Sequence, residues 1–544
     1  MPLAHPPTVS AWIHRLAREC GEREMIVLGD SRLTYAAAEA ESSLLARGML
    51  AAGIGKGTRV GLLMPNGPDW ALAWLAASRI GALVVPICTF YRARELRWTL
   101  RHADIQVLLT ADRLLGHDYL ARLEEAAPGL ADQTGPPLQL CALPYLRQIR
   151  VWGEGRGPWA SPGREGLERL AAENPALDDE FLRQTESCVT PADPAVLIYT
   201  SGSTSDPKGA VHTHGSIVRH AHNLNQRRRL RSDDRLYTPM PLFWVGGFLT
   251  GLLACMDVGA CLLCDESFDA ERTLELLERE RATLVLGWPF HGKAMAQQPS
   301  FAERDLSSLR PGARNALPPA HLPPVDPDLR PNWLGMTESF GPHCAGDMEI
   351  ILPEHQRGSF GTPLPGIEHK VVDGETGELL PEGREGEICV RGYSLMQRLY
   401  KVEREETFDA EGFYHTGDAG YFSADGHVFF TGRLCDTIKT AGANVAPREV
   451  ELVLESFDEV KEAYVVGTPD PDRGEIVVAA VVLKAGRRTQ PDDLRRRAKD
   501  ELSAFKVPKH IFLCEKSELP ETATGKVRKD RLRDQLAERI AALG

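Results

Sequence analysis

The chain has 544 residues and a formal net charge of −13, from 63 Lys and Arg against 76 Asp and Glu. This length exceeds what one hydrophobic core organises, so we expect at least two domains, with the larger one divided into subdomains. The composition is that of an ordinary globular protein. The acidic balance argues against a protein that binds nucleic acid or an anionic membrane surface through its net charge.

The chain carries no clear targeting or membrane signal. Its N-terminus lacks a basic start followed by an apolar core, so we expect no signal peptide. The longest apolar stretch, residues 70–90, contains Arg79 and Pro86 and indicates a helix followed by a strand, not a transmembrane segment. Of the eleven cysteines, the one close pair, Cys261 and Cys264, lies in a strand-like run and faces opposite ways. We therefore expect buried structural thiols and a cytoplasmic location.

The first 110 residues alternate between helical and strand-like patterns. Helices are predicted over residues 8–20, 35–52, 68–80 and 93–102, and strands over residues 59–64, 82–86 and 105–110. Because strands that alternate with helices pair in parallel, we expect an α/β fold with mostly parallel sheets and helices on both faces. Residues 111–190 add helical patterns at 119–126 and 165–172 and a strand at 148–152, and they suggest no chemistry.

A loop rich in glycine and hydroxyl residues, YTSGSTSDPKG, occupies residues 199–209 directly after an apolar run. Glycine lets the backbone approach a ligand closely, hydroxyls and backbone N–H groups form a concave anion site, and Lys208 adds a positive charge. This combination suits a polyphosphate. A P-loop is excluded because Asp206 and Pro207 stand where that motif needs its Gly-Lys-Ser/Thr.

The loop resembles the signature of the acyl-adenylate-forming enzymes, which include acyl-CoA synthetases, adenylation domains and firefly-type luciferases. Ser205 stands where that signature usually has its second glycine. Further family motifs follow in order, so the resemblance covers nearly the whole chain: GMTE at residues 335–338, YHTGD at 414–418, the run that starts GRLCD at 432, and PETATGK at 520–526.

The resemblance implies sites for ATP, Mg²⁺ and coenzyme A, with coenzyme A as a co-substrate. By this resemblance, the ATP phosphates are expected to bind the loop residues Thr200, Ser201, Gly202, Ser203, Thr204 and Lys208. The other nucleotide contacts are expected from Leu334, Gly335, Met336, Asp418 and Arg433. Among these, Asp418 is expected to bind the ribose hydroxyls. The expected catalytic residues are Thr337, Glu338 and Lys526, with Glu338 as the Mg²⁺ ligand. Gly442 belongs to the loop expected to line the pantetheine tunnel.

Residues 241–248 correspond to the start of the helix that lines the acyl pocket, with Trp244, Val245 and Gly246 as pocket residues. Amino-acid-activating relatives carry an Asp near position 244, and many acyl-CoA ligases carry a His there. Since Trp244 cannot neutralise an ammonium group, we expect an apolar acid, aliphatic or aromatic. The alternative for Trp244 is a core tryptophan without contact to substrate.

The segment after the phosphate loop is expected to form a helix over residues 211–223. It carries four histidines, His212, His214, His220 and His222. Without a carboxylate or cysteine at ligand spacing, core or surface histidines are favoured over a metal site. For the cluster Arg227, Arg228, Arg229 and Arg231, a solvated face is weighed against contacts with the phosphates of coenzyme A.

Three positions depart from the family pattern. Leu334 replaces the tyrosine that usually stacks on adenine, so either an aliphatic contact or Trp333 takes its place. Residues 312–316 lack the usual Gly-Gly-Ala-Pro run that borders the adenine and acyl sites. Cys435, at the expected pivot, replaces the usual Lys or Asp.

The resemblance implies a large N-terminal domain of α/β subdomains over residues 1–432, a hinge at 433–436, and a small mobile α+β domain at 437–544 that carries Lys526. We expect an ATP-dependent carboxylate–CoA ligase that works in two half-reactions. Its rivals are an acyl-adenylating enzyme that loads a carrier protein in trans and a noncatalytic acyl- or nucleotide-binding relative. Retention of Thr204, Lys208, Glu338, Asp418, Arg433 and Lys526 argues against the last. The sequence does not determine the chain length of the acid or whether the protein forms a homodimer.

Overall fold

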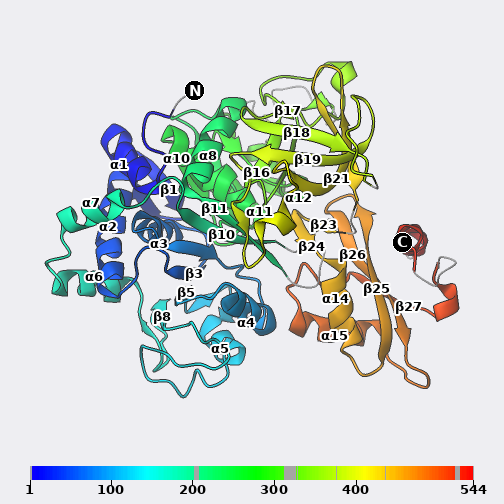
Figure 1. Cartoon of the computed structure of the whole chain (residues 1–544), viewed down its shortest axis with the longest axis horizontal. Helices are drawn as coiled ribbons and strands as arrows, with labels where there is room; N and C mark the ends of the chain where they lie inside the picture. The colour runs from blue at the N-terminus through cyan, green and yellow to red at the C-terminus, as the bar shows by residue number, and fades with distance from the viewer. Residues whose placement is uncertain are drawn as a thin grey trace. The chain divides into compact units, whose positions relative to one another are not determined.

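The computed structural model describes residues 3–200, 207–310, 326, 329–374, 376–434, 437–520 and 527–542 (Figure 1). Its contacts divide the chain into two units. The larger unit comprises Met1–Thr89, Arg97–Ile198 and Gly209–Gly432, and the smaller one Phe90–Leu96, Tyr199–Lys208 and Arg433–Gly544. The main boundary lies between Gly432 and Arg433, at the start of the expected hinge, whose movement stays a prediction.

An eight-stranded sheet organises the larger unit, in the order β20-β11-β10-β4-β3-β5-β8-β9. The strands are β3 (Arg59–Leu63), β4 (Leu83–Pro86), β5 (Val107–Ala111), β8 (Gln148–Trp152), β9 (Ser161–Pro162), β10 (Pro194–Thr200), β11 (Lys208–Thr213) and β20 (Arg398–Leu399). From β10 through β4, β3, β5 and β8 to β9 the neighbouring strands pair in parallel, whereas β20 runs antiparallel to β11. The expected α/β class is confirmed.

A second sheet has the order β14-β12-β13-β1-β2. Its strands are β1 (Glu24–Leu28), β2 (Ser31–Thr34), β12 (Arg235–Tyr237), β13 (Cys261–Cys264) and β14 (Leu284–Val285). Strand β1 pairs in parallel with β13, so that Ile26 lies opposite Leu262. Cys261 and Cys264, at the two ends of β13, are both buried, as expected for structural thiols.

Helix α3 (Pro68–Arg79) lies in the core of this unit. Every residue from Trp70 to Arg79 is buried, and α3 contacts strands β3 and β4 of one sheet and β1 and β2 of the other. The apolar stretch at residues 70–90 is therefore a core helix followed by β4, as expected. Within the described residues, no helix is both long enough and apolar enough to cross a membrane.

Five further helices of the first 200 residues match their predicted positions within two residues. They are α1 (Val9–Cys20), α2 (Tyr35–Ala51), α4 (Ala93–His102), α5 (Tyr119–Ala126) and α6 (Arg164–Glu173). Helix α7 (Asp179–Ser187) and the short hairpin of β6 (Arg113–Leu114) and β7 (His117–Asp118) were not predicted. Side-chain oxygens of Thr8, Thr34 and Asp118 cap α1, α2 and α5, which explains where these helices begin.

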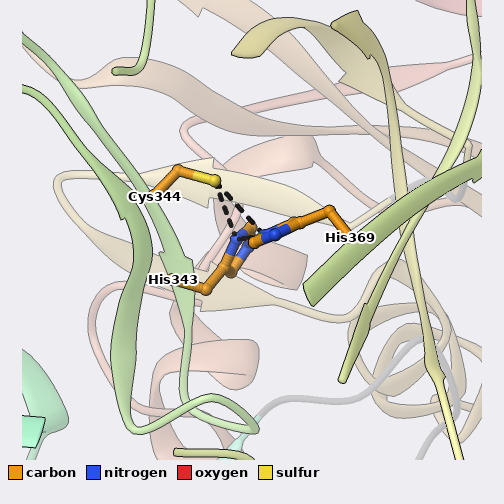
Figure 2. A group of neighbouring side chains, drawn as sticks. All are labelled: His343, Cys344 and His369. Carbon is orange, nitrogen blue, oxygen red and sulfur yellow. Dashed lines mark hydrogen bonds between the residues drawn. The ribbon is translucent and has the colours of Figure 1, made fainter. Parts of the chain in front are cut away.

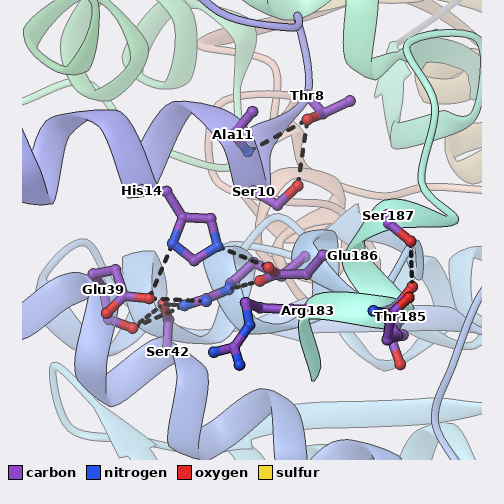
Figure 3. Close-up of polar contacts among 12 residues, drawn as sticks. Thr8, Ser10, Ala11, His14, Glu39, Ser42, Arg183, Thr185, Glu186 and Ser187 are labelled. Atoms are coloured by element: carbon purple, nitrogen blue, oxygen red, sulfur yellow. Dashed lines mark hydrogen bonds and ion pairs between the residues drawn. The ribbon is translucent and has the colours of Figure 1, made fainter. Parts of the chain in front are cut away.

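An ionic network of two buried and two half-buried side chains joins α1, α2, α3 and α7 (Figure 3). The Arg79 side chain, 1% exposed, pairs with Glu186 at 2.5 Å and with Glu39 at 3.0 Å. His14 contacts the same two carboxylates at 2.7 and 3.3 Å. Hydrogen bonds to Glu186 and Glu39 raise the pKa of His14 to about 9. The hydrogen bond from His14 lowers the pKa of Glu39 to about 2. The network therefore stabilises the contacts among α1, α2, α3 and α7.

The helix predicted over residues 211–223 begins later than expected. Residues 211–213 belong to strand β11, and helix α8 covers His214–Arg228. Thr213 forms a capping box: its hydroxyl accepts from the Ser216 N–H at 3.2 Å, and the Ser216 hydroxyl accepts from the Thr213 N–H at 3.1 Å. This cap, which satisfies donors that a helix start leaves open, fixes the boundary and makes the prediction wrong by three residues.

The rest of the larger unit contains two antiparallel sheets and several short helices. The sheets are β15 (Trp333–Met336), β16 (Gly341–Ala345) and β17 (Thr362–Pro363), then β18 (Ile367–Val372), β19 (Gly386–Gly392), β21 (Tyr414–Phe422) and β22 (Val428–Arg433). The helices are α9 (Val245–Gly247), the π-helix η1 (Phe248–Leu253), α10 (Ala254–Val258), α11 (Ala270–Arg279), α12 (Pro289–Ala296), η2 (Pro299–Glu303), η4 (Glu354–Gln356) and α13 (Arg404–Thr407).

The smaller unit has the α+β character expected of the C-terminal region. Its strands are β23 (Ile438–Thr440), β24 (Ala443–Val445), β25 (Val460–Asp470), β26 (Gly474–Leu483) and β27 (His510–Leu513), and its helices are α14 (Pro447–Glu455), α15 (Pro491–Glu501), η5 (Lys516–Glu518) and α16 (Lys529–Ala541). Pro447 occupies the first turn of α14, where its fixed φ and missing N–H are favourable.

Candidate active site

The GMTE motif forms the end of β15 and the turn that follows it. The Phe340 N–H donates to the Thr337 carbonyl at 2.9 Å, and the Ser339 hydroxyl donates to the Gly341 carbonyl at 2.6 Å. A Cβ on Gly335 would lie 2.3 Å from the Gly341 oxygen, so only glycine permits this close approach of β15 and β16. The result is a tight turn that presents Thr337 and Glu338, both half-buried.

His212 on β11 fixes this turn from one side. Its Nε2 donates to the Thr337 carbonyl at 2.8 Å, and its side chain is fully buried. Burial lowers the pKa of His212 to about 3, so the imidazole is neutral near pH 7. On the other side, the Met396 N–H donates to the Glu338 carbonyl at 2.7 Å. The sequence favours a core role for His212 and gives no sign of this contact, because nothing in the order of the chain links position 212 to position 337.

The segment expected to line the acyl pocket packs against the same turn. A Cβ on Gly341 would lie 2.5 Å from Leu249 Cδ2 and 3.4 Å from Val245 Cγ1. The Phe248 ring meets the Phe340 ring edge-on at 5.9 Å between centroids. The structure therefore joins the GMTE turn and the start of the expected pocket helix in one packed region.

Trp244 precedes α9 and is half-buried. Its indole meets the Phe243 ring at 5.3 Å and the Trp288 ring at 6.4 Å, both edge-on. Trp288 in turn stacks on Phe290 at 5.9 Å. Gly246 follows in the first turn of the helix, where its carbonyl accepts from the Thr250 hydroxyl inside a π-helical segment. Such segments occur often at functional sites.

Asp418 lies in the middle of β21 and is 1% exposed. Its N–H donates to the Thr416 hydroxyl at 3.0 Å, and that hydroxyl donates to the Ile388 carbonyl at 2.5 Å. A carboxylate is expensive to bury. Its position is therefore typical of a binding site and is compatible with the expected contact to ribose hydroxyls.

Leu334 and Trp333 are both buried, at 3% and 6% exposure. Successive residues of a strand face opposite sides. The Arg228 guanidinium lies over the Trp333 ring at 5.7 Å, and it donates to the Thr250 carbonyl at 2.8 Å. The Trp333 indole is thus engaged by Arg228, while the adenine contact of Leu334 or Trp333 stays a prediction.

The histidines after the phosphate loop form no metal group among the described residues. His212, His214 and His220 are fully buried, as expected for core histidines, and His222 contacts Asp257 at 3.1 Å.

The arginine cluster is engaged within the fold. Arg229 pairs with Asp347 at 2.6 Å and Arg231 with Glu349 at 3.3 Å, while Arg228 is buried. These contacts weaken the case that the cluster binds the phosphates of coenzyme A.

Several predicted site positions lie outside the described residues. They are Ser201, Gly202, Ser203, Thr204, Lys526, residues 312–316 and Cys435, together with the side chain of Arg433. Thr200 ends β10 and Lys208 begins β11, so the two strands flank the loop. Gly442 lies between β23 and β24 with φ +78°, a left-handed conformation that glycine adopts without strain.

Comparisons with known proteins agree with this arrangement. The family model described as AMP-binding enzyme matches residues 13–400, and the model for the AMP-binding enzyme C-terminal domain matches residues 449–526. A putative acyl-CoA synthetase, YngI of Bacillus subtilis, is 30% identical over 550 residues, covering 98% of this chain and 97% of the relative. The mitochondrial medium-chain acyl-CoA ligase ACSF2 of Bos taurus is 29% identical over 549 residues, covering 98% and 88%.

Among solved structures, the amide bond synthetase McbA from Marinactinospora thermotolerans is 26% identical with a TM-score of 0.76, covering 96% of this chain and 99% of that one. The two sequence relatives are named as a synthetase and a ligase, which agrees with the expected enzyme class. The cytoplasmic location stays a prediction, since one relative is named as mitochondrial. The chain belongs to the AMP-binding enzyme family, as an AMP-forming ligase of the acyl-CoA synthetase type.

Proposed function

We propose that this chain is an ATP-dependent carboxylate–CoA ligase that converts an apolar fatty or aryl acid to an acyl-adenylate and then to an acyl-CoA thioester. The observation that carries the proposal is the packing of the Thr337–Phe340 turn. It is fixed through His212 on one side, and on the other side the Phe340 ring meets the Phe248 ring of the expected pocket helix. A nucleotide motif and an acyl-pocket segment in direct contact suit a reaction between ATP and a carboxylate.

In the first half-reaction, an oxygen of the substrate carboxylate attacks the α-phosphorus of ATP. A new P–O bond forms as the bond to pyrophosphate breaks. Such transfers depend mainly on positioning and charge stabilisation. Asp418 would accept hydrogen bonds from the ribose hydroxyls, and Thr337 would contact the α-phosphate. Lys526 would bring together the two anions that must react.

Glu338 fits the expected Mg²⁺ site, because the ion prefers hard oxygen ligands and this half-buried carboxylate lies beside Thr337 on the turn. Magnesium bound there would neutralise charge on the ATP phosphates. The contribution of the protein is to fix the carboxylate through the backbone contacts of residues 337–340.

In the second half-reaction, the thiolate sulfur of coenzyme A attacks the acyl carbon, and the bond from that carbon to AMP breaks. The thiol proton is released and AMP leaves as the anion. We propose that the region after residue 432 moves about the hinge at 433–436 between the two steps, so that Lys526 withdraws and Gly442 lines the path of pantetheine. The left-handed turn at Gly442 supports a close backbone approach to that thin chain.

The substrate class follows from the pocket segment. Trp244, Val245 and Gly246 carry no ionisable group, and the neighbours of Trp244 include the rings of Phe243 and Trp288. An apolar acid fits such a wall better than an amino acid, whose ammonium group would need a counter-charge. The relative named for medium-chain acids makes that length the first to test.

Two alternatives to coenzyme A compete as the acceptor of the acyl group, namely an amine and a carrier protein. McbA, named as an amide bond synthetase, shares the fold over nearly all of this chain. Carrier-protein loading in trans is the other alternative.

The decisive assay follows pyrophosphate release with MgATP across fatty, aryl and amino acids, with coenzyme A, a carrier protein or an amine as acceptor. Turnover on an apolar acid that requires coenzyme A supports the proposal. A stoichiometric burst that coenzyme A does not extend contradicts it and favours another acceptor. The absence of release with every acid would favour a noncatalytic protein.

A further inference from the structure

A group of two histidines and one cysteine lies where two sheets of the larger unit meet. His343 and Cys344 are neighbours on β16, and His369 is on β18 (Figure 2). His343 Nδ1 lies 2.8 Å from His369 Nε2. The Cys344 sulfur lies 3.5 Å from His343 Nδ1 and 3.3 Å from His369 Nε2. Three atoms with the chemistry of metal ligands thus converge on one point.

The environment of the group is sheltered. His343 and Cys344 are fully buried, and His369 is half-buried. Nδ1 of His369 is buried and has no hydrogen-bond partner among the described residues. The short N–N contact needs one N–H donor and one lone pair, so at least one imidazole is neutral, the form that binds metal ions. Protonation of both rings is therefore incompatible with this arrangement.

The distances fit a four-coordinate ion with a small adjustment. Zinc binds imidazole nitrogen at about 2.0–2.1 Å and thiolate sulfur at about 2.3 Å, so tetrahedral angles place two nitrogens about 3.3 Å apart and nitrogen and sulfur about 3.6 Å apart. The three observed distances, 2.8, 3.3 and 3.5 Å, are each within about 0.5 Å of these values. Separating the two rings by about half an ångström would admit the ion.

We propose that His343, Cys344 and His369 bind one Zn²⁺ ion, with water or another small ligand in the fourth position. Two imidazoles and one thiolate favour borderline metals such as zinc and disfavour Mg²⁺, which prefers oxygen. Binding deprotonates the Cys344 thiol, so one proton leaves for each ion bound. The imidazole hydrogen between the rings moves to another ring nitrogen, which leaves both imidazoles neutral.

The bound ion would act as a cross-link between sheets. Strand β16 belongs to the sheet of β15 and β17, whereas β18 belongs to the sheet that contains Asp418 on β21. Cys344 also lies opposite Leu334 in the register of β15 and β16. An ion at this point would tie the strand of the GMTE motif to the neighbouring sheet. The site is separate from Glu338 and does not depend on the proposed reaction.

A second group on the opposite face of β18 and β19 provides an internal control. Cys389 pairs in register with Lys370, one residue from His369, so it faces the other side of the sheet. There the Nδ1 of His415 contacts both Glu387, at 2.8 Å, and the sulfur of Cys389, at 3.4 Å. The His415 side chain is 44% exposed. The ligand atoms of Glu387, Cys389 and His415 also lie within 4.8 Å of one another, but this group is more exposed than the His343 group and offers only one imidazole, so it is the weaker candidate.

The test uses the full-length chain after treatment with a chelator. Titration with Co²⁺, which reports tetrahedral thiolate ligation by its charge-transfer and visible bands, is followed by displacement with Zn²⁺. We expect one cobalt per chain in the wild type, displacement by one equivalent of zinc, and a higher melting temperature with zinc. Cys344→Ser should lose the charge-transfer band. His369→Gln should bind cobalt at least about 100-fold more weakly, because mutation of residues that only support a metal ligand already lowers metal affinity by about 10- to 100-fold.

Cys389→Ser is the matched control and should bind cobalt like the wild type. A wild-type chain without a thiolate–cobalt band would overturn the proposal before any variant is made. Retention of the band in Cys344→Ser, or its loss in Cys389→Ser, would equally overturn it by placing the thiolate elsewhere. Because every readout is spectroscopic or thermal, a failure of the proposed ligase activity leaves this test unaffected.

Discussion

Replacing His212 tests whether the turn that carries Thr337 and Glu338 must be fixed for adenylation. The buried Nε2 donates to the Thr337 carbonyl at 2.8 Å. In His212→Leu that carbonyl keeps the Phe340 N–H as a donor but loses the second one, and one such hydrogen bond contributes about 0.5–1.5 kcal/mol. If the turn loses this amount of positioning in the transition state, the rate of adenylate formation falls by about 2- to 10-fold. His212→Gln, whose amide can still donate, should lose less.

The assay is ATP–pyrophosphate exchange with an accepted acid, with kcat and the KM for ATP measured between pH 6 and 9. A positioning effect appears mainly in kcat. Since the pKa of His212 is about 3, the ratio of wild-type to variant rates should not change across this range. His222→Gln is the control, because His222 lies on the same helix–strand segment but contacts Asp257.

Two results would refute the reasoning. The first is a His212→Leu enzyme that is less stable but has the exchange kinetics of the wild type, since the histidine would then serve only the core. The second is an equal loss in His222→Gln, which would indicate a general effect of changes in this region.

Three further predictions concern the hinge, the pocket and stability. Lys526→Ala should slow adenylate formation by at least about 100-fold, as for loss of one transition-state donor. In single-turnover assays it should largely spare thioester formation from supplied acyl-adenylate, and equal losses in both steps would contradict two separate conformations. Trp244→Ala should shift the preferred acid toward longer or bulkier chains by about 10-fold in relative kcat/KM, the order expected for one or two methylene groups; an unchanged acid profile would identify Trp244 as a core residue. The raised pKa of His14, about 9, means that its network stabilises the fold fully below pH 6.5 and loses that contribution as pH rises through 9. His14→Gln should therefore lower the melting temperature at pH 6 and flatten its decline between pH 6.5 and 9, and parallel wild-type and variant profiles would show that the network does not titrate in this way.

Much of the fold could be predicted because its signals are local. The apolar spacing of residues 9–16 and the Pro68 helix start were enough to place α1 and α3. The boundary of α8 could not be placed, because a run that continues a strand and a run that starts a helix look alike until the Thr213 cap is seen.

For the candidate site too, local features could be predicted from the sequence, whereas contacts between distant residues needed the structure. Its motifs were recognisable from consecutive residues, since Gly335 and Gly442 meet backbone requirements that other residues do not. Local signals alone did not show how Leu334 and Trp333 are placed, and only the structure shows that the Trp333 indole packs under Arg228.

By itself, the sequence determined the order of the motifs, the family resemblance and most of the helices, since each depends on neighbouring residues and their local hydrogen bonding. Only the tertiary structure decided the pairing of β1 with β13, the contact of His212 with Thr337 and the meeting of His343 and Cys344 with His369. These contacts join positions far apart in the chain. They depend on strand register and on which face a side chain occupies, and a shift of one residue in register would send each side chain to the other face.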